Sequence, residues 1–332
     1  MVFVGMLRDF SFRDYTFSDF ALQDGRILVK QTGAHIPLNG EFFRDFARGA
    51  SFAAEVSAIS AARQARGRLG KSKKKRIRIS FAPVTPYPWY AIWAVSHLAD
   101  LDIVRDPAAA NILFYFEDSE YTTRLPLKPD GKPVLNGDCL DIRKSMVGEK
   151  FHEIFGYTLH VDPLIHHGLA LRKSERNGVH DGQIIPCPYF ANTQGHVFQR
   201  LIDNTQDGLV YTDIRTPIVG GTIPAVYLKR RSAMARFSND NFRVDLTTAD
   251  AQFTPEEQQK IIAFARAMQL DFGGMDVLRD RKDGRIYIVD VNKTDMGPPT
   301  ALPRQDKLTA MRALADSFRA FVAEHLKADA PS

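Results

Sequence analysis

Cysteine is scarce in this chain. Only two of the 332 residues are cysteines, Cys139 and Cys187, and they stand far apart. An isolated pair of thiols provides neither a disulfide framework nor the closely spaced ligands of a zinc site. We therefore expect two unpaired thiols, which fits a protein kept in a reducing cytosol.

Long apolar runs are absent as well. No stretch approaches the roughly 18 uninterrupted apolar residues that a membrane-spanning helix needs. The N-terminal sequence meets charge at Arg8 and Asp9, too early for the apolar region of a signal peptide. With 44% hydrophobic and 25% charged residues, the chain has enough apolar material for one or two large cores. We therefore expect a cytoplasmic protein that does not enter the membrane.

The sequence carries an excess of positive charge. Its formal net charge is +5 and its pI is about 9.1, and much of the excess lies in the run KSKKKRIR at residues 71–78. This run passes directly into the alternating pattern IRISFA, so it also fits the solvated start of a strand. Because no interleaved aromatics or zinc motif accompany it, nucleic-acid binding is not favoured. A basic chain also suits an enzyme that handles phosphates and anionic substrates.

Hydrophobic patterning divides the chain into three parts. Residues 1–72 form an N-terminal extension with one predicted strand (25–33) and one long predicted helix (40–67). Residues 73–140 alternate strands with a helix, which is typical of a parallel or mixed α/β sheet. Residues 141–328 form the third and largest part.

The third part combines helices, strands and hairpins. Its middle helix should begin at Thr254, which forms a capping box with Glu257, and should end at Gly273-Gly274. The residues Gly220-Gly221 predict the turn of a hairpin. The expected elements are helices at 141–157, 254–272 and 307–326, strands at 169–174, 183–190 and 196–203, and hairpins at 211–231 and 275–292.

The tripeptide Asp271-Phe272-Gly273 suggests a protein kinase, in which such an aspartate binds magnesium. A kinase also needs a glycine-rich loop, a lysine on an early strand and an H-R-D-x-x-x-x-N loop. None of these is present in the sequence. We therefore reject the kinase hypothesis and expect Asp271 to lie in a solvated turn after the helix, where it binds nothing.

The residues that follow suit a metal better. Asp290 and Asn292 are two apart on one predicted strand and therefore share a face, and a turn at Asp283-Gly284 would bring Asp276 beside them. Three oxygen-bearing side chains suit Mg²⁺, which completes its shell with water and phosphate. Acids also flank hairpins for solubility, but Asp290 interrupts the apolar run IYIVDV, where an unpaired charge would be costly.

Asp276, the segment Asp290-Val291-Asn292 and the loop KTDMGPP together resemble the C-terminal metal motif of ATP-grasp enzymes. The segments LALRKSERNGVHDG and FQRLIDNTQDGLVYTDIRTPIVGGTIPAVYLKRR are similar to the family's lysine strand with its flexible loop and to its adenine hinge with the hairpin after it. The similarity spans residues 141–299 and is of the kind seen in ribosomal-protein glutamate ligases and D-alanine–D-alanine ligases. It implies an ATP-grasp fold, in which two α+β subdomains grip ATP, preceded by a small α/β domain.

The resemblance assigns a set of residues to the nucleotide. Lys173 would contact phosphate, and Asp213 would accept the ribose hydroxyls unless it pairs with Arg215. The hinge would read adenine through backbone groups, and Arg200 stands there in place of the usual glutamate. The implied nucleotide-binding residues are Lys150, Lys173, Gln199, Arg200, Leu201, Ile202, Asp213 and Lys229.

Metal and substrate residues follow from the same resemblance. Asp276, Asp290 and Asn292 would hold Mg²⁺, with Mn²⁺ as an alternative ion, and Asp290 replaces the commoner glutamate. Arg215 and Arg230 would hold the acid substrate or stabilise an oxyanion, because a guanidinium matches carboxylate and phosphate geometry. Three further sets are candidates: Lys229 or Arg230 for the γ-phosphate, Asn239 or Asn241 near the metal, and His180 and Asp181 near substrate or phosphate.

The implied activity is a ligase that uses ATP and magnesium. It would join a carboxylate to an amine through an acylphosphate and release ADP, with both substrates unidentified. Two alternatives stay open: a phosphotransferase on the same fold that acts on a hydroxylated molecule, and a non-catalytic nucleotide-binding module. The segment TPYPWY at residues 85–90 is a candidate lining of the substrate pocket or part of the core, and a homo-oligomer is compatible with the sequence.

Overall fold

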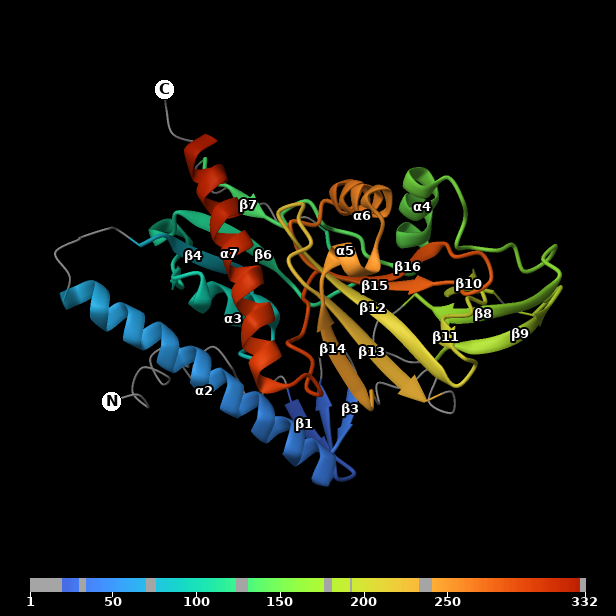
Figure 1. The fold of residues 1–332 in the computed structure, drawn as a ribbon, viewed down its shortest axis with the longest axis horizontal. Coiled ribbons are helices and arrows are strands. Elements are labelled where there is room, and N and C mark those ends of the chain that lie inside the picture. The colour runs from blue at the N-terminus through green and yellow to red at the C-terminus, as the bar shows by residue number, and fades with distance from the viewer. Residues whose placement is uncertain are drawn as a thin grey trace.

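The computed structural model describes residues 20–29, 34–69, 76–123, 131–175, 181–191, 193–232 and 241–328. These residues form four β-sheets with helices packed against them (Figure 1). Both cysteines are unpaired, as expected. The elements have the mixed α and β content that the sequence predicts.

The first sheet is small and antiparallel, and a long helix follows it. Asn39 begins this helix, because its side-chain oxygen accepts a hydrogen bond of 2.9 Å from the backbone N–H of Phe42. The predicted strand and helix of this region are both present, although residues 30–33 lie outside the described part. The elements are β1 (Phe20–Gln23), β2 (Arg26–Val29), β3 (Ala34–Pro37) and α2 (Gly40–Leu69).

The second sheet is parallel throughout, with strand order β5-β4-β6-β7. Every residue of β6 and of α3 is buried, which explains why both segments are almost wholly apolar. The expectation of an α/β sheet in this part of the chain is confirmed. The elements are β4 (Arg78–Pro83), α3 (Ala91–Leu98), β5 (Asp102–Ile103), η2 (Pro107–Ala109), β6 (Ile112–Phe116) and β7 (Val134–Leu135).

The third and fourth sheets are antiparallel. The third has the order β10-β8-β9, and the fourth has the order β14-β13-β12-β15-β16 with β11 paired to β12. In Figure 1, α4 and α6 lie over one face of the fourth sheet, and their apolar side chains share a core with it. The strands are β8 (Gly168–Ser174), β9 (Gln183–Cys187), β10 (His196–Arg200), β11 (Thr205–Gln206), β12 (Val210–Val219), β13 (Val226–Ser232), β14 (Arg243–Thr247), β15 (Phe272–Arg279) and β16 (Ile286–Asn292), and the helices are α4 (Lys144–Phe155), α5 (Ala249–Gln252) and α6 (Pro255–Ala267).

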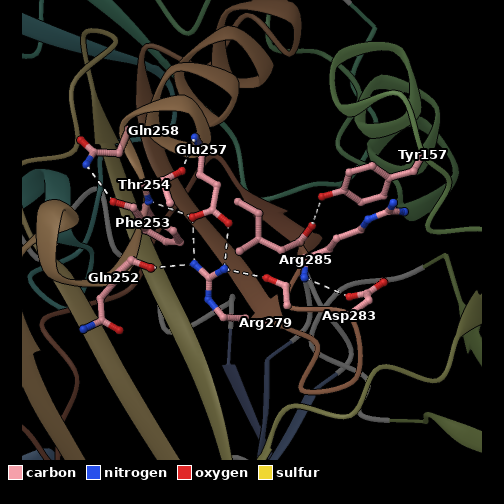
Figure 2. Close-up of polar contacts among 11 residues, drawn as sticks. Tyr157, Gln252, Phe253, Thr254, Glu257, Gln258, Arg279, Asp283 and Arg285 are labelled. Atoms are coloured by element: carbon pink, nitrogen blue, oxygen red, sulfur yellow. Dashed lines mark hydrogen bonds and ion pairs between the residues drawn. The ribbon is translucent and has the colours of Figure 1, made fainter.

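Helix α6 begins as predicted but ends elsewhere. The capping box between Thr254 and Glu257 is present, and Arg279 of β15 reaches the same carboxylate (Figure 2). The expected stop at Gly273-Gly274 is wrong, because the helix ends at Ala267, Gln269 adopts a left-handed φ of 54°, and both glycines lie inside β15.

The last helix, α7 (Arg304–Ala328), begins slightly before the expected residue 307. It packs on α3, and the Arg319 guanidinium donates hydrogen bonds of 2.9 and 3.0 Å to the carbonyls of Ala99 and Leu98. The C-terminal helix therefore shares a core with the parallel sheet, far from it in sequence. In the described part of the chain, every helix is too short or too polar to span a bilayer.

Candidate functional site

One face of the fourth sheet collects the predicted metal residues. Arg215 of β12 is the cross-strand partner of Asp276 on β15, and Asp276 is the partner of Asp290 on β16. Directly opposed residues of a sheet point to the same face, so the three side chains form a row. The predicted hairpin turn between β15 and β16 is thus present, and it brings Asp276 beside Asp290 as expected.

Arg215 is buried and lies between two carboxylates. Its Nη1 lies 3.2 Å from Asp276 Oδ1, its Nη2 lies 2.5 Å from Asp295 Oδ1, and the residue is 7% exposed. Burial disfavours the charge, but the carboxylates of Asp295 and Asp276 outweigh it and raise the pKa of Arg215 above its ordinary value. The arginine is therefore a permanent cation in this row. Asp295, from the loop after β16, has no counterpart in the sequence predictions.

The pKa values of the two acids in the row are shifted in opposite directions. Burial raises the pKa of Asp276, but Lys229, whose Nζ lies 3.5 Å from Oδ1, and Arg215 outweigh this effect and hold it below the usual range. For Asp290, burial and the negative charge of Asp276 prevail over the positive charges of Lys144, Lys173 and Arg215, and its pKa is raised. Asp290 is thus a half-buried carboxylate whose desolvation the surrounding cations do not fully offset.

This donor set fits a hard divalent cation. Two carboxylates and the amide of Asn292 are oxygen ligands, and Mg²⁺ takes few of these from protein. The described residues contain no group of three or more His, Cys, Asp or Glu side chains that could enclose a metal. An ion here would therefore need water or phosphate to complete its shell, and the unmet charge of Asp290 is what it would neutralise.

Hydrogen bonds hold the loop that carries Asn292. Asn292 Oδ1 accepts from the backbone N–H of Thr294 at 2.9 Å, and the Thr294 hydroxyl lies 3.1 Å from the same oxygen. That hydroxyl donates to Asp118 Oδ1 at 2.7 Å, and the Tyr90 hydroxyl donates to Asp118 Oδ2 at 2.9 Å. Asp118 was missed by the sequence reasoning, although it follows a buried parallel strand, where ligand-binding residues often lie.

Two lysines approach the row from other elements. The positive charges of Lys144 and Lys173 both act on the carboxyl group of Asp290 and lower its pKa. Lys173 is a predicted residue of β8, whereas Lys144 is the first residue of α4, is buried, and was not predicted. Lys150, the predicted residue of α4, is partly exposed instead, and its Nζ pairs with Glu153 Oε2 at 2.7 Å. The charge of Lys144 therefore acts on the row, whereas Lys150 pairs with a neighbour on its own helix.

The predicted hinge contains a buried amide. Gln199 is 1% exposed, and neither polar atom of its side chain has a hydrogen-bond partner among the described residues. A buried unpaired amide points to a ligand or a water molecule beside it. Ile202 is also buried and Leu201 is half-buried, whereas Arg200 is exposed with its guanidinium 5.9 Å from the ring centre of Tyr287. The expectation of backbone-only contacts at the hinge does not account for this buried amide side chain.

Strand β13 shows which cations face the row. Lys229 pairs in register with Asp213, so both lie on the face of Asp276. Asp213 accepts a hydrogen bond of 2.9 Å from Asn204 and pairs with Arg231, rather than with Arg215. Arg230 points to the opposite face, where it pairs with Asp245. The prediction that places Arg230 among the catalytic residues therefore puts it on the wrong face of β13, and Arg231 occupies the facing position.

Two of the remaining predicted positions, Asp271 and Asp181, accept hydrogen bonds from backbone groups. Asp271 is not solvated as expected: its Oδ2 accepts a hydrogen bond of 2.6 Å from the backbone N–H of Asn136, so it holds a loop. Asp181 Oδ1 accepts from the backbone N–H of Ser174 at 3.2 Å. Asn241 is described, whereas His180 and Asn239 lie outside the described residues.

Comparison with protein families adds to this geometry. Residues 183–297, which include Arg215, Asp276, Asp290 and Asn292, match the model of the RimK-like ATP-grasp domain. The chain has the ATP-grasp fold. The fold inferred from the sequence is thereby confirmed. A comparison of the sequence with curated proteins found no match.

Solved structures show the ATP-grasp fold as well. The ATP-grasp ligase PsnB complexed with minimal precursor, Mg and ADP is 12% identical, with a TM-score of 0.51 over 74% of this chain and 98% of that one. PsnB with a phosphomimetic variant of the precursor is 10% identical, with a TM-score of 0.51 over 74% and 99%. D-alanine–D-alanine ligase from Bacillus anthracis complexed with ATP is 14% identical, with a TM-score of 0.47 over 76% and 99%. At these identities, the PsnB structures support the fold of the ATP-grasp domain and nothing finer.

Proposed function

We propose that this protein is a magnesium-dependent enzyme that uses ATP to ligate a carboxylate to an amine through an acylphosphate, with release of ADP. The row of Arg215, Asp276 and Asp290 carries the proposal. It sets two oxygen-donor acids beside a fixed cation, and lysines from β8, β13 and α4 surround it. Such a distribution suits a triphosphate together with its metal ion.

The roles follow from position and charge. Lys144, Lys173 and Lys229 bind phosphate oxygens, and Gln199 with its hinge neighbours binds the adenine. Asp276, Asp290 and Asn292 would hold Mg²⁺, which would neutralise the charge of the phosphates when bound. Asp213 stays a candidate for the ribose, although Asn204 and Arg231 already occupy its oxygens.

The chemistry needs no nucleophilic side chain. An oxygen of the substrate carboxylate attacks the γ-phosphorus, and ADP leaves. The amine nitrogen then attacks the acyl carbon, phosphate leaves with the bonding electrons, and the nitrogen gives up a proton. Arg215 keeps Asp276 ionised throughout, because it stays charged at every working pH. We assign Lys229 to the transferred phosphoryl group, because it is the cation of β13 that lies beside Asp276 in the row.

An ADP-release assay on a substrate panel tests the proposal. The panel combines amines with free amino acids and with peptides that carry Asp or Glu, since the PsnB complexes contain a precursor. We expect ADP only when an acid, an amine and Mg²⁺ are all present. The variant Asp290→Asn should reduce turnover by about 100-fold or more, as removal of a group that stabilises a charged transition state typically does.

The exposed acid Asp316 of α7 provides a matched control. Asp316→Asn removes the same charge far from the row and should leave turnover within twofold of wild type. An Asp290→Asn variant with unchanged turnover and magnesium dependence would show that the metal assignment is wrong. ADP release with a hydroxylated acceptor alone would identify a phosphotransferase, and ATP binding without turnover on any pair would identify a binding module.

A further inference from the structure

A cleft lies between α2 and the start of α7, away from the nucleotide face. Its volume is about 620 Å³, which lies in the range of small-molecule and peptide pockets. Figure 1 shows α2 crossing the N-terminal end of α7, where the cleft is located. The lining residues come from α2 and from the segment 300–307, which follows the loop after β16.

Positive charge dominates the lining. Arg44 and Arg48 project from α2, Arg304 and Lys307 come from α7, and Glu55 is the carboxylate that lines the cleft with them. Arg304 Nε lies 2.9 Å from Glu55 Oε2. Beside the cleft, Arg48 Nη1 lies 3.4 Å from Asp45 Oδ1, so both nearby acids are already paired, and Arg44 and Lys307 remain in excess. The excess of cations creates a local positive potential that an anionic ligand would neutralise.

Lys307 is the buried member of this group. It is 7% exposed, and its ammonium donates a hydrogen bond of 2.9 Å to the carbonyl of Thr300. Burial and the nearby charge of Arg48 lower its pKa below the ordinary lysine value. A buried ammonium beside a like charge is energetically costly, and a bound anion would reduce this cost for Lys307.

Apolar residues also line the cleft, and an exposed aromatic ring lies near it on α2. Phe52 and Leu302 are buried in its lining. Phe43 lies one helical turn before the lining residue Ala47, on the same face of α2, and is 59% exposed. A ligand in this cleft can therefore extend from the cations onto an exposed aromatic ring.

We propose that this cleft binds an acidic peptide segment, in which carboxylate side chains alternate with apolar ones. Carboxylates would pair with Arg44, Arg48 and Lys307, and an apolar side chain would cover Phe43. The combination of clustered cations with an adjoining exposed ring favours an extended chain over a small anion. The proposal does not depend on the ligase activity, because it concerns binding at a separate surface.

Fluorescence anisotropy with a labelled peptide of alternating glutamate and leucine tests this site, on the full chain and without ATP. We expect saturable binding that weakens with added salt, because exposed ion pairs are screened. The double variant Arg44→Gln/Arg48→Gln should weaken binding by about tenfold or more, since two charge-assisted contacts are lost. Arg281→Gln/Lys282→Gln, which removes the same charge from the exposed turn between β15 and β16, should leave binding within twofold.

Three outcomes would overturn the proposal. The first is the absence of saturable binding to the wild-type chain, and the second is equal binding of the matched peptide of glutamine and leucine. The third is a small anion as the true ligand: citrate would displace the peptide at equal carboxylate concentration, and Phe43→Ala would leave peptide affinity unchanged. Under the proposal, Phe43→Ala weakens the peptide severalfold and the glutamine peptide does not bind.

Discussion

Arg215 lies between the carboxylates of Asp276 and Asp295, with little exposure to solvent. A guanidinium in this position keeps Asp276 ionised, whereas Asp290, the next acid in the row, has a raised pKa because of burial. The neighbouring cations therefore keep Asp276 ionised, and a bound cation would lower the pKa of Asp290. Asp276 and Asp290, which form one cross-strand pair, thus have pKa values that are shifted in opposite directions.

The backbone beneath this ion pair tolerates no side chain. A Cβ added to Gly274 would lie 2.8 Å from Arg215 Nε and closer still to Asp295 Oδ2, so Gly274→Ala must displace the pair. We expect ADP release to fall by about tenfold or more, because the row loses its fixed cation geometry. The folded structure should persist, since the displaced groups are side chains at the edge of the core. Turnover and circular dichroism measure both effects.

Gly49 offers a control for the same substitution. A Cβ there meets no atom within 4 Å, and the residue lies inside α2. Gly49→Ala should leave turnover unchanged and stabilise the helix by about 0.5–1 kcal/mol. Equal activities of Gly274→Ala and wild type would show that the Arg215–Asp295 pair does not position the site.

The residue pattern predicts part of this site and misses part. The two-residue period of a strand places Asp290 and Asn292 on one face, and the hairpin turn adds Asp276. The same period assigns Lys229 and Arg231 to one face and Arg230 to the other, so the misplacement of Arg230 could have been avoided. Lys144 and the buried Gln199 side chain depend on how separate elements pack, and a local pattern contains no information about that.

At the start of α6, the same carboxylate caps the helix and pairs with an arginine of β15. Arg279 donates to both oxygens of Glu257, at 2.8 and 2.9 Å, and to the carbonyl of Gln252 at 2.7 Å (Figure 2). Glu257 also accepts from the backbone N–H of Thr254 in the capping box. The sequence predicts the start of α6 from this box. It does not predict the end, because Gln269 adopts the left-handed conformation without any glycine to signal it.

Glu257 should make the stability of the fold depend on pH. Burial raises the pKa of Glu257, but its bonds to Arg279 and Thr254 outweigh burial and lower it. The stabilisation is therefore complete above the unfolded pKa of about 4.3 and is lost as the pH falls through the folded value. We expect Glu257→Gln to reduce the free energy of unfolding at pH 7 by about 1–2 kcal/mol. Urea unfolding from pH 7 to 3 measures the change.

Glu256, one residue earlier in the same turn, is the natural control. Its exposed carboxylate pairs only along the helix, with Lys260 at 2.9 Å. Glu256→Gln should change the free energy of unfolding by less than about 0.5 kcal/mol at either pH. If the wild type and Glu257→Gln differed by the same amount at pH 3 as at pH 7, the ion pair with Arg279 would not be the cause.

At the scale of the whole molecule, hydrophobic cores join the parallel sheet and the fourth sheet to the helices. One core contains α3, α7 and the parallel sheet together with Val219, Tyr227 and Phe272 of the fourth sheet. A second contains α4, α6 and the opposite face of the fourth sheet, and the third sheet has a small core of its own. The sequence predicts each element separately, but its division at residue 140 does not anticipate that the C-terminal helix packs on α3. The loop after β16, which contains Asp295, touches the second part of the chain, because Ala91 N of α3 donates to the carbonyl of Asp295 at 2.9 Å.

Thr294 is the residue through which the parallel sheet holds this loop. Its hydroxyl donates to Asp118 at 2.7 Å and lies 3.1 Å from Asn292 Oδ1, and the residue is 3% exposed. Thr294→Val keeps the shape but leaves a partly buried carboxylate oxygen without its donor, a loss of about 1–3 kcal/mol. We expect kcat to fall by about tenfold and the Mg²⁺ concentration for half-maximal ADP release to rise, because Asn292 loses its support. Thr309→Val, which removes an exposed hydroxyl from α7, should change neither value. Unchanged magnesium dependence in Thr294→Val would mean that the loop is held without the parallel sheet.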